Sequence, residues 1–235
     1  METEAVKLRS GLSENSGNNG ESQPLIVEAY KKIKQMIFQQ RLVPGQRLVY
    51  KDLGDLLNMS RTPIINALNR LEQEGFVTSE NFRGFYVKPI DLKEIWEAFG
   101  MREALEVYAV EQAIKSGDRK DLQILGEKQL AHELYTPPYY TQEKFYMDME
   151  FHTQIASMAK NRVLKFQLKR NFEHLYLRSK LNDYDIKRME ISANDHRRLV
   201  ESIKNKDILG GIDAIRSHIQ SARDSVISCL SKELE

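Results

Sequence analysis

The strongest constraint on the fold is the spacing of apolar residues from Leu92 onward, which repeats with the period of an α-helix. This spacing predicts helices at about 92–115, 118–134, 140–159, 162–181, 184–204 and 207–232. Three short stretches interrupt the helical pattern: Gly117, the segment “TPPYY” and Gly210–Gly211. The last of these lies inside or at the start of the final helix. Because no strand-like alternation interrupts the pattern, residues 91–235 are predicted to form an all-helical bundle.

The preceding segment, residues 24–90, combines helical periods with a hairpin pattern. Periodicity predicts helices near residues 25–40 and 51–57, and Ser60 is a favourable N-cap for a third helix over residues 61–73. The stretch “GFVTSENFRGFYVKPI” alternates apolar and polar residues around a polar tip, which is typical of a β-hairpin. Three helices and a hairpin predict a winged helix-turn-helix, so the whole chain is expected to be mostly α. Residues 1–23, which are rich in Gly, Ser, Asn and Glu, are predicted to be a disordered tail.

Composition narrows the classes of function. No apolar run approaches the roughly 20 residues that a membrane span needs, and the N-terminus lacks a signal-peptide pattern. The single cysteine, Cys229, excludes an internal disulfide framework. Residues 24–90 hold 10 Lys and Arg against 6 Asp and Glu (+4), whereas residues 91–235 hold 23 against 24 (−1). We therefore expect a cytoplasmic protein without a membrane partner, whose N-terminal part tolerates a polyanion.

The helix over residues 61–73 has the pattern of a DNA-reading helix. One face is apolar, and the opposite face carries Thr62, Ile65, Asn66 and Asn69. Asn amides bond bidentately to adenine, and an apolar side chain contacts the thymine methyl group. Three further candidates for base or phosphate contacts are Arg61 at the helix start and Arg83 with Gly84 at the hairpin tip. The same polar faces could instead be solvated or could contact another protein.

Asp148 and His152 stand four positions apart in “DMEFHTQIASMAKN”, in the middle of the apolar stripe of their predicted helix. An exposed ion pair would lie on the polar face, so the spacing favours burial. A buried carboxylate and imidazole are costly unless they are paired or coordinate a metal. His196 is also predicted to face the interior, and His218 is predicted to lie on the flank of the last helix, where small neighbours leave room. His132 and His174 are predicted to lie on the surface. Spacing alone leaves open whether the buried set binds a metal or only forms hydrogen bonds.

The stretch “LVYKDLGDLLNMSRTPIINALNRLEQEGFVTSENFRGFYV” resembles the winged-helix domain of the GntR family of bacterial transcription regulators. The resemblance covers residues 25–88 and includes “SRTP”, the “EGFV” that follows the helix, and an Arg-Gly wing tip. It implies binding to double-stranded operator DNA. Where this family usually has Arg-Glu, the chain has Ile65 and Asn66, so we expect a half-site that is richer in A·T pairs.

Residues 92–230 resemble the FCD effector domain of the FadR-type branch of this family, through “MREALEVYAV”, “DMEFHTQIASMAKN” and “DHRRLVESIKNKD” with the later “AIRSHI”. The resemblance implies an all-helical bundle that holds a divalent ion, Zn or Ni, with one Asp and three His. Carried over residue by residue, these ligands are Asp148, His152, His196 and His218. A small carboxylate effector beside the metal would bind Arg102, and weaker candidates for its pocket are Asn161, Asn171 and Arg178.

Together these features predict a ligand-responsive, homodimeric transcription regulator rather than an enzyme. Two alternatives remain at this stage. Three His and one Asp with open positions could form the active site of a metalloenzyme. The buried polar residues could also merely specify packing, in a metal-free regulator that binds DNA constitutively.

Overall fold

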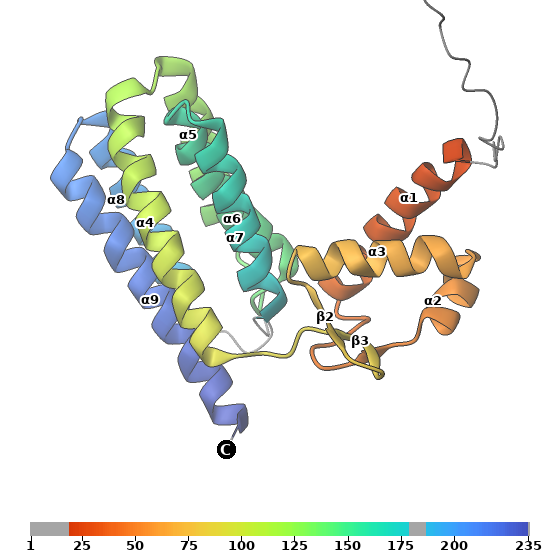
Figure 1. Ribbon diagram of the computed structural model, residues 1–235. Helices are drawn as coiled ribbons and strands as arrows, with labels where there is room; N and C mark the ends of the chain where they lie inside the picture. The colour runs from red at the N-terminus through yellow and green to blue at the C-terminus, as the bar shows by residue number, and fades with distance from the viewer. Residues whose placement is uncertain (1–18, 179–186, 235) are drawn as a thin grey trace, which may run out of the picture.

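The computed structural model describes residues 19–178 and 187–234 (Figure 1). It confirms the mostly helical fold, with a small N-terminal helical unit that carries a hairpin and a C-terminal helical bundle. The elements are α1 (Asn19–Phe38), β1 (Arg47–Leu48), α2 (Tyr50–Leu57), α3 (Arg61–Gln73), β2 (Val77–Glu80), β3 (Gly84–Val87), α4 (Leu92–Ser116), α5 (Arg119–Leu134), α6 (Gln142–Met158), α7 (Arg162–Arg178), α8 (Lys187–Lys204) and α9 (Ile208–Leu234). Among these described helices, none is both long and apolar enough to span a membrane.

Two details at the N-terminus differ from the sequence-based prediction. Helix α1 begins at Asn19, so its first residues belong to the segment that was predicted to be a tail. Glu21 and Gln23 are good helix formers, and their polarity left no apolar period to detect there. Strand β1 was not predicted, because its two residues are too few to show alternation. It extends the hairpin into a three-stranded antiparallel sheet in the order β1-β3-β2.

The N-terminal unit is built around the inner face of α3. Ile64, Ala67, Leu68 and Leu71 are fully buried, as the period of this helix predicts. They pack in one core with Ile33 of α1 and with apolar residues of α2 and the strands. Burial of this face fixes the rotation of α3, so the opposite face is held toward solvent.

The C-terminal bundle, helices α4 to α9, has its own apolar core (Figure 1). Its helix starts are fixed by side-chain caps: Asp91 accepts a hydrogen bond from the backbone of Lys93, and Thr141 accepts one from Lys144. Asp118 and Asp121 form a reciprocal capping box at the start of α5. These caps set where α4, α5 and α6 begin, and so they set which side chains turn inward.

The two units touch where α1 meets α7. The rings of Phe38 and Tyr176 stack with centroids 5.2 Å apart, and the Tyr176 hydroxyl donates a hydrogen bond to the Phe38 carbonyl (2.8 Å). Lys34 lies 2.9 Å from Glu173. His174 is half-buried and stacks on Phe76 with centroids 4.7 Å apart, so the prediction that it lies on the surface was wrong. Its partner comes from a distant part of the chain, which the period of a single helix cannot reveal.

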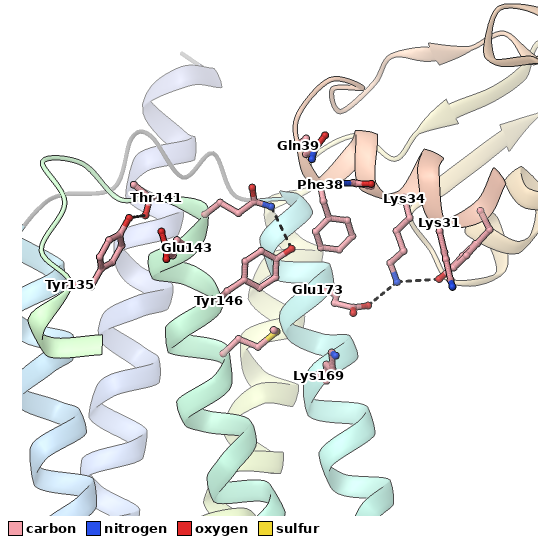
Figure 2. A pocket seen from close by; sticks show the side chains of 14 residues that line it. Lys31, Lys34, Phe38, Gln39, Tyr135, Thr141, Glu143, Tyr146, Lys169 and Glu173 are labelled. Atoms are coloured by element: carbon pink, nitrogen blue, oxygen red, sulfur yellow. Dashed lines mark hydrogen bonds and ion pairs between the residues drawn. The ribbon is translucent and has the colours of Figure 1, made fainter. Parts of the chain in front are cut away.

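Beside this contact lies a cleft of about 880 Å³, between α1 on one side and α6 and α7 on the other. Figure 2 shows Phe38, Tyr146 and Glu173 around it, with the ion pair between Lys34 and Glu173 at one edge. The cleft is open and its lining is mixed in polarity. The cluster of carboxylates and imidazoles lies elsewhere, inside the bundle.

Candidate functional site

Three helices bring Asp148, His152, His196 and His218 together inside the bundle. Asp148 and His152 lie one turn apart on α6, His196 lies on α8 and His218 lies on α9. All four side chains are buried, and their ligand atoms lie within 4.8 Å of one another. The Nε2 atom of His152 is 3.1 Å from His218 Nε2 and 3.3 Å from His196 Nε2. Asp148 Oδ1 lies 3.3 Å from His196 Nε2 and 3.7 Å from His152 Nε2.

The outer nitrogens of two of these imidazoles face carboxylates. His152 Nδ1 contacts Glu106, and His218 Nδ1 lies 3.4 Å from Asp195 Oδ2. A carboxylate in this place favours the tautomer with its proton on Nδ1, which leaves the Nε2 lone pair pointing inward. Two inward lone pairs 3.1 Å apart repel each other unless a cation lies between them, either a metal ion or a proton held on one Nε2.

The donor set fits a divalent ion. Nitrogen ligands about 2.0–2.1 Å from a zinc ion lie roughly 3.0–3.4 Å from each other, and the two closest imidazole pairs here fall in that range. Imidazole nitrogens together with one carboxylate oxygen suit Zn, Ni and related ions. The residues present therefore fit the metal that the family resemblance implies.

The pKa values place three of these four groups in the protonation states that a metal requires. Burial lowers the pKa of His196 to about 3, and burial together with the nearby Arg188 holds the pKa of His218 well below its ordinary value. Burial would raise the pKa of Asp148, but the imidazoles of His152 and His196 outweigh it and hold this pKa well below 3.8. At neutral pH the cluster therefore offers an ionised carboxylate and two neutral imidazoles. Glu106 and Asp148 outweigh burial and raise the pKa of His152, so this imidazole must give up a proton when it binds a metal.

His132 is also part of this cluster, which corrects the prediction that it lies on the surface. It is 1% exposed, its Nε2 is 3.9 Å from Asp148 Oδ1, and its ring centroid is 4.6 Å from that of His196. The Nζ atom of Lys144 donates to the carbonyl of His132 and holds this end of α5 in place. The apolar residues of α5 are spread around the helix, so its sequence gave no clear inner face.

We expect acid to destabilise the metal-stripped protein well above the pH at which carboxylates titrate. Burial lowers the pKa of His132 to about 4 and that of His196 to about 3, against 6.5 for an exposed imidazole. Between pH 6.5 and 4 the unfolded chain binds protons that these folded imidazoles do not bind, so stability falls as the pH falls. At pH 5 the loss is on the order of 2 kcal/mol for each group.

Thermal melts of the stripped protein between pH 7 and pH 4.5 would measure this slope. His152 does not add to it, because Glu106 and Asp148 outweigh burial and raise its pKa, so it is protonated in both states below pH 6.5. The variant His132→Phe should show a shallower slope. Equal slopes in the two proteins would contradict the assignment.

A small cavity of about 40 Å³ adjoins the cluster, and two buried arginines line it together with Asp148 and Ser192. Arg102 Nε donates to Glu106 (2.6 Å), whereas its NH2, 3.8 Å from Asp148 Oδ2, has no hydrogen-bond partner. Arg188 NH2 donates to the carbonyl of His218 (3.1 Å), and its buried NH1 has no partner. Sequence reasoning missed Arg188, although it lies two turns before His196 on the same face of α8.

Two of the other predicted effector residues, Asn161 and Asn171, form hydrogen bonds within the bundle instead of lining this cavity. Asn161 Oδ1 accepts a hydrogen bond from the backbone of Leu164 and so caps the start of α7. Asn171 donates to the carbonyl of Ala98, and neither Asn is among the described residues that line the cavity. Arg178 ends α7, and its side chain lies outside the described residues.

The predicted DNA-contacting residues share one surface of the N-terminal unit. Thr62, Asn66 and Asn69 are exposed on α3, and Ile65 is half-buried among them. At the start of the same helix, the guanidinium of exposed Arg61 lies 4.2 Å from the ring of Tyr50. At the hairpin tip the side chain of Arg83 is 76% exposed, and the adjacent Gly84 has φ +98°. These groups are free to approach a nucleic acid.

Comparisons with known proteins match both parts of the chain. Residues 25–87 match the model of the bacterial regulatory proteins of the gntR family, and residues 97–221 match that of the FCD domain. The HTH-type transcriptional regulator YdhC of Bacillus subtilis is 30% identical over 186 residues, which cover 78% of this chain and 83% of YdhC. The Nta operon transcriptional regulator of Aminobacter aminovorans is 24% identical over 187 residues, covering 80% and 87%. The structure of E. coli McbR/YncC superposes with a TM-score of 0.69 at 21% identity, over 90% of this chain and 99% of that one, which shows a shared fold.

Proposed function

The chain belongs to the GntR family of DNA-binding transcription regulators and carries an FCD domain, and we propose that a small carboxylate bound at a metal centre in that domain controls its operator binding. The family models and the relatives described above are those of regulators. They confirm the prediction of a regulator over that of a metalloenzyme.

The observation that carries the proposal is the convergence of four buried ligand atoms beside a cavity with two unpartnered guanidinium nitrogens. A divalent ion held by Asp148, His152, His196 and His218 would supply positive charge and an open position for a carboxylate oxygen. Arg102 and Arg188 would each donate to the same carboxylate, because guanidinium N–H groups bind carboxylates in strong charge-assisted hydrogen bonds. Zn or Ni suits this donor set best.

The size of the cavity favours a short monocarboxylate. Its volume of about 40 Å³ leaves room for one small acid group beside the metal position. A second carboxylate would bring a further charge into a buried place, which is costly.

A path of packed side chains connects the site with the DNA-binding unit. Helix α6 carries Asp148 and His152, and on the same helix the rings of Phe145 and Tyr146 lie 4.9 Å and 5.8 Å from that of Tyr176. Tyr176 in turn stacks on Phe38 of α1. A shift of α6 on effector binding would therefore move the surface on which α1 rests, provided that the effector binds the two arrangements with different affinity.

The proposed division of labour assigns residues 24–90 to DNA binding and residues 91–235 to effector binding and dimerisation, with residues 1–23 as a tail. A homodimer would present two α3 helices to a two-fold operator in the cytoplasm. The exposed apolar side chains of Trp96, Met101 and Tyr108 on α4 are a candidate surface for the dimer contact.

The test is operator affinity as a function of added acid. Fluorescence anisotropy with a DNA duplex selected by the wild-type protein should show a shift of at least fivefold when metal-loaded protein meets short monocarboxylates such as acetate or lactate. The shift should vanish after chelation and return with Zn²⁺ or Ni²⁺. Operator affinity that no acid in the panel changes would overturn the proposal.

Replacing Arg188 with Gln should weaken binding of the active monocarboxylate by about 10- to 100-fold, because one charge-assisted hydrogen bond to the ligand is lost. Isothermal titration of the acid into metal-loaded protein would measure this change. Metal content should stay near that of the wild type, since Arg188 is not a ligand. A matched control is Arg197→Gln on the same helix, where the guanidinium is exposed and pairs with Glu133. Equal affinities in all three proteins would exclude Arg188 from the site.

A further inference from the structure

Phe82, at the tip of the β2–β3 hairpin, is an unusual side chain for its position. It is fully exposed (109% of the reference area), the highest value among the large apolar residues in the described part of the chain. Its backbone has φ +63°, a left-handed conformation that Asn or Gly adopts readily and that Phe adopts at a cost. The neighbouring Asn81 would suit the conformation better. Neither core packing nor turn chemistry therefore explains a Phe here.

The hairpin holds this ring at a fixed place relative to α3. Glu72 of α3 accepts hydrogen bonds from both the backbone and the hydroxyl of Ser79 on β2. Val77 and Val87 pair at the base of the hairpin and are buried in the core. A strand rises about 3.3 Å per residue, so the tip extends on the order of 10 Å beyond this anchored pair. Figure 1 shows the hairpin lying beside α3.

We propose that Phe82 inserts into the DNA minor groove beside the half-site read by α3, wedges between two base pairs and kinks the duplex. Apolar side chains that enter the minor groove partly unstack a base step in this way. The adjacent Arg83 has an exposed guanidinium that can bind the flanking phosphates or the groove itself. A pyrimidine–purine step is the easiest to unstack, so Phe82 would add a preference for TA or CA at a position that α3 does not contact.

The occupant is DNA rather than another protein, for two reasons. A protein-docking surface needs an apolar patch, whereas Phe82 is flanked by polar and charged residues, Asn81 and Arg83, and stands alone at the tip. Its hairpin is also tied to α3, the helix whose exposed face bears the residues suited to reading bases. The wedge is an addition to the family's DNA binding and does not depend on the metal centre.

The experiment compares Phe82→Asn with Phe82→Leu in the full-length protein, on a duplex selected by the wild type. Asn suits the left-handed backbone, so this variant should melt at or above the wild-type temperature while it binds the duplex about tenfold more weakly. It should also lose the DNA bend measured by energy transfer between the duplex ends. Leu retains an apolar wedge and should keep most of the bend.

Two further measurements separate a wedge from other roles. 2-Aminopurine placed at the flanking step should brighten when the wild type binds, but not when Phe82→Asn binds. The slope of DNA affinity against salt concentration should be unchanged in Phe82→Asn and smaller in Arg83→Ala. Of these two side chains, only Arg83 carries a charge that displaces counterions from the phosphates. The proposal is overturned if Phe82→Asn binds and bends DNA as the wild type does. It is also overturned if Phe82→Asn bends DNA normally but no longer self-associates, because Phe82 would then contact protein.

Discussion

The double variant Asp148→Asn/His196→Gln should purify without bound metal, with less than about 0.1 ion per chain against about one in the wild type. Asp148 is the one carboxylate among the four converging groups, and its Oδ1 lies near two of the three imidazoles. Both replacements are neutral and close in size, so the bundle should fold. Stabilisation by saturating metal, about 4 kcal/mol when free metal exceeds its Kd a thousandfold, should disappear.

The matched control replaces an Asp and a His that lie outside the cluster, in the variant Asp213→Asn/His174→Ala. Asp213 is exposed on α9, and His174 packs on Phe76 at the contact between the two units. This protein should keep its metal even if its melting temperature falls. Stoichiometric metal in Asp148→Asn/His196→Gln, or equal metal loss in the control, would refute the ligand set.

The double variant Asn66→Ala/Asn69→Ala should weaken specific operator binding by about 10- to 1,000-fold. Each exposed amide on α3 can form a bidentate pair with adenine, and each such pair discriminates by about 1–3 kcal/mol. Neither side chain contributes to the buried face of α3, so the fold should be unaffected. Anisotropy with specific and random duplexes would show a large loss on the first and a small loss on the second.

The base preference of the wild type tests the same helix. The chain has Ile65 and Asn66 where the GntR family usually has Arg-Glu. Sites that the wild type selects from random DNA should therefore be richer in A·T pairs. A half-site dominated by G·C pairs would contradict this account of α3.

The period of apolar residues predicted much of the fold, because burial of one face is what fixes a helix in a bundle. Helix α3 begins and ends where the pattern placed it, and its four inward residues are all buried. Asp148, His152 and His196 were predicted to face inward for the same reason, and the structure buries all three. His218, which the period placed on the flank of its helix, is buried as well. That these four residues bind a metal is a proposal, which the metal measurements test.

The residues whose roles were not predicted correctly are those whose roles depend on contacts between helices. His132 lies on a helix whose apolar residues do not form one face, and it is buried because α5 packs near His196 of α8. Arg188 was not predicted because its importance depends on a cavity shared with Arg102 of α4. The amide of Asn161 is of a kind that can bind a ligand, but this residue lies at the start of α7 and caps the helix instead. A single-helix pattern carries no information about such neighbours.

The most direct test of the central claim is isothermal titration of Zn²⁺, and separately of Ni²⁺, into the chelator-stripped full-length protein. The convergence of two inward imidazole lone pairs 3.1 Å apart predicts one tight site per chain for at least one of these ions, with a rise in melting temperature. The same titration should release protons at pH 6, because His152, whose pKa is raised, must become neutral to bind the metal. No binding heat and an unchanged melting temperature with both ions would contradict the account.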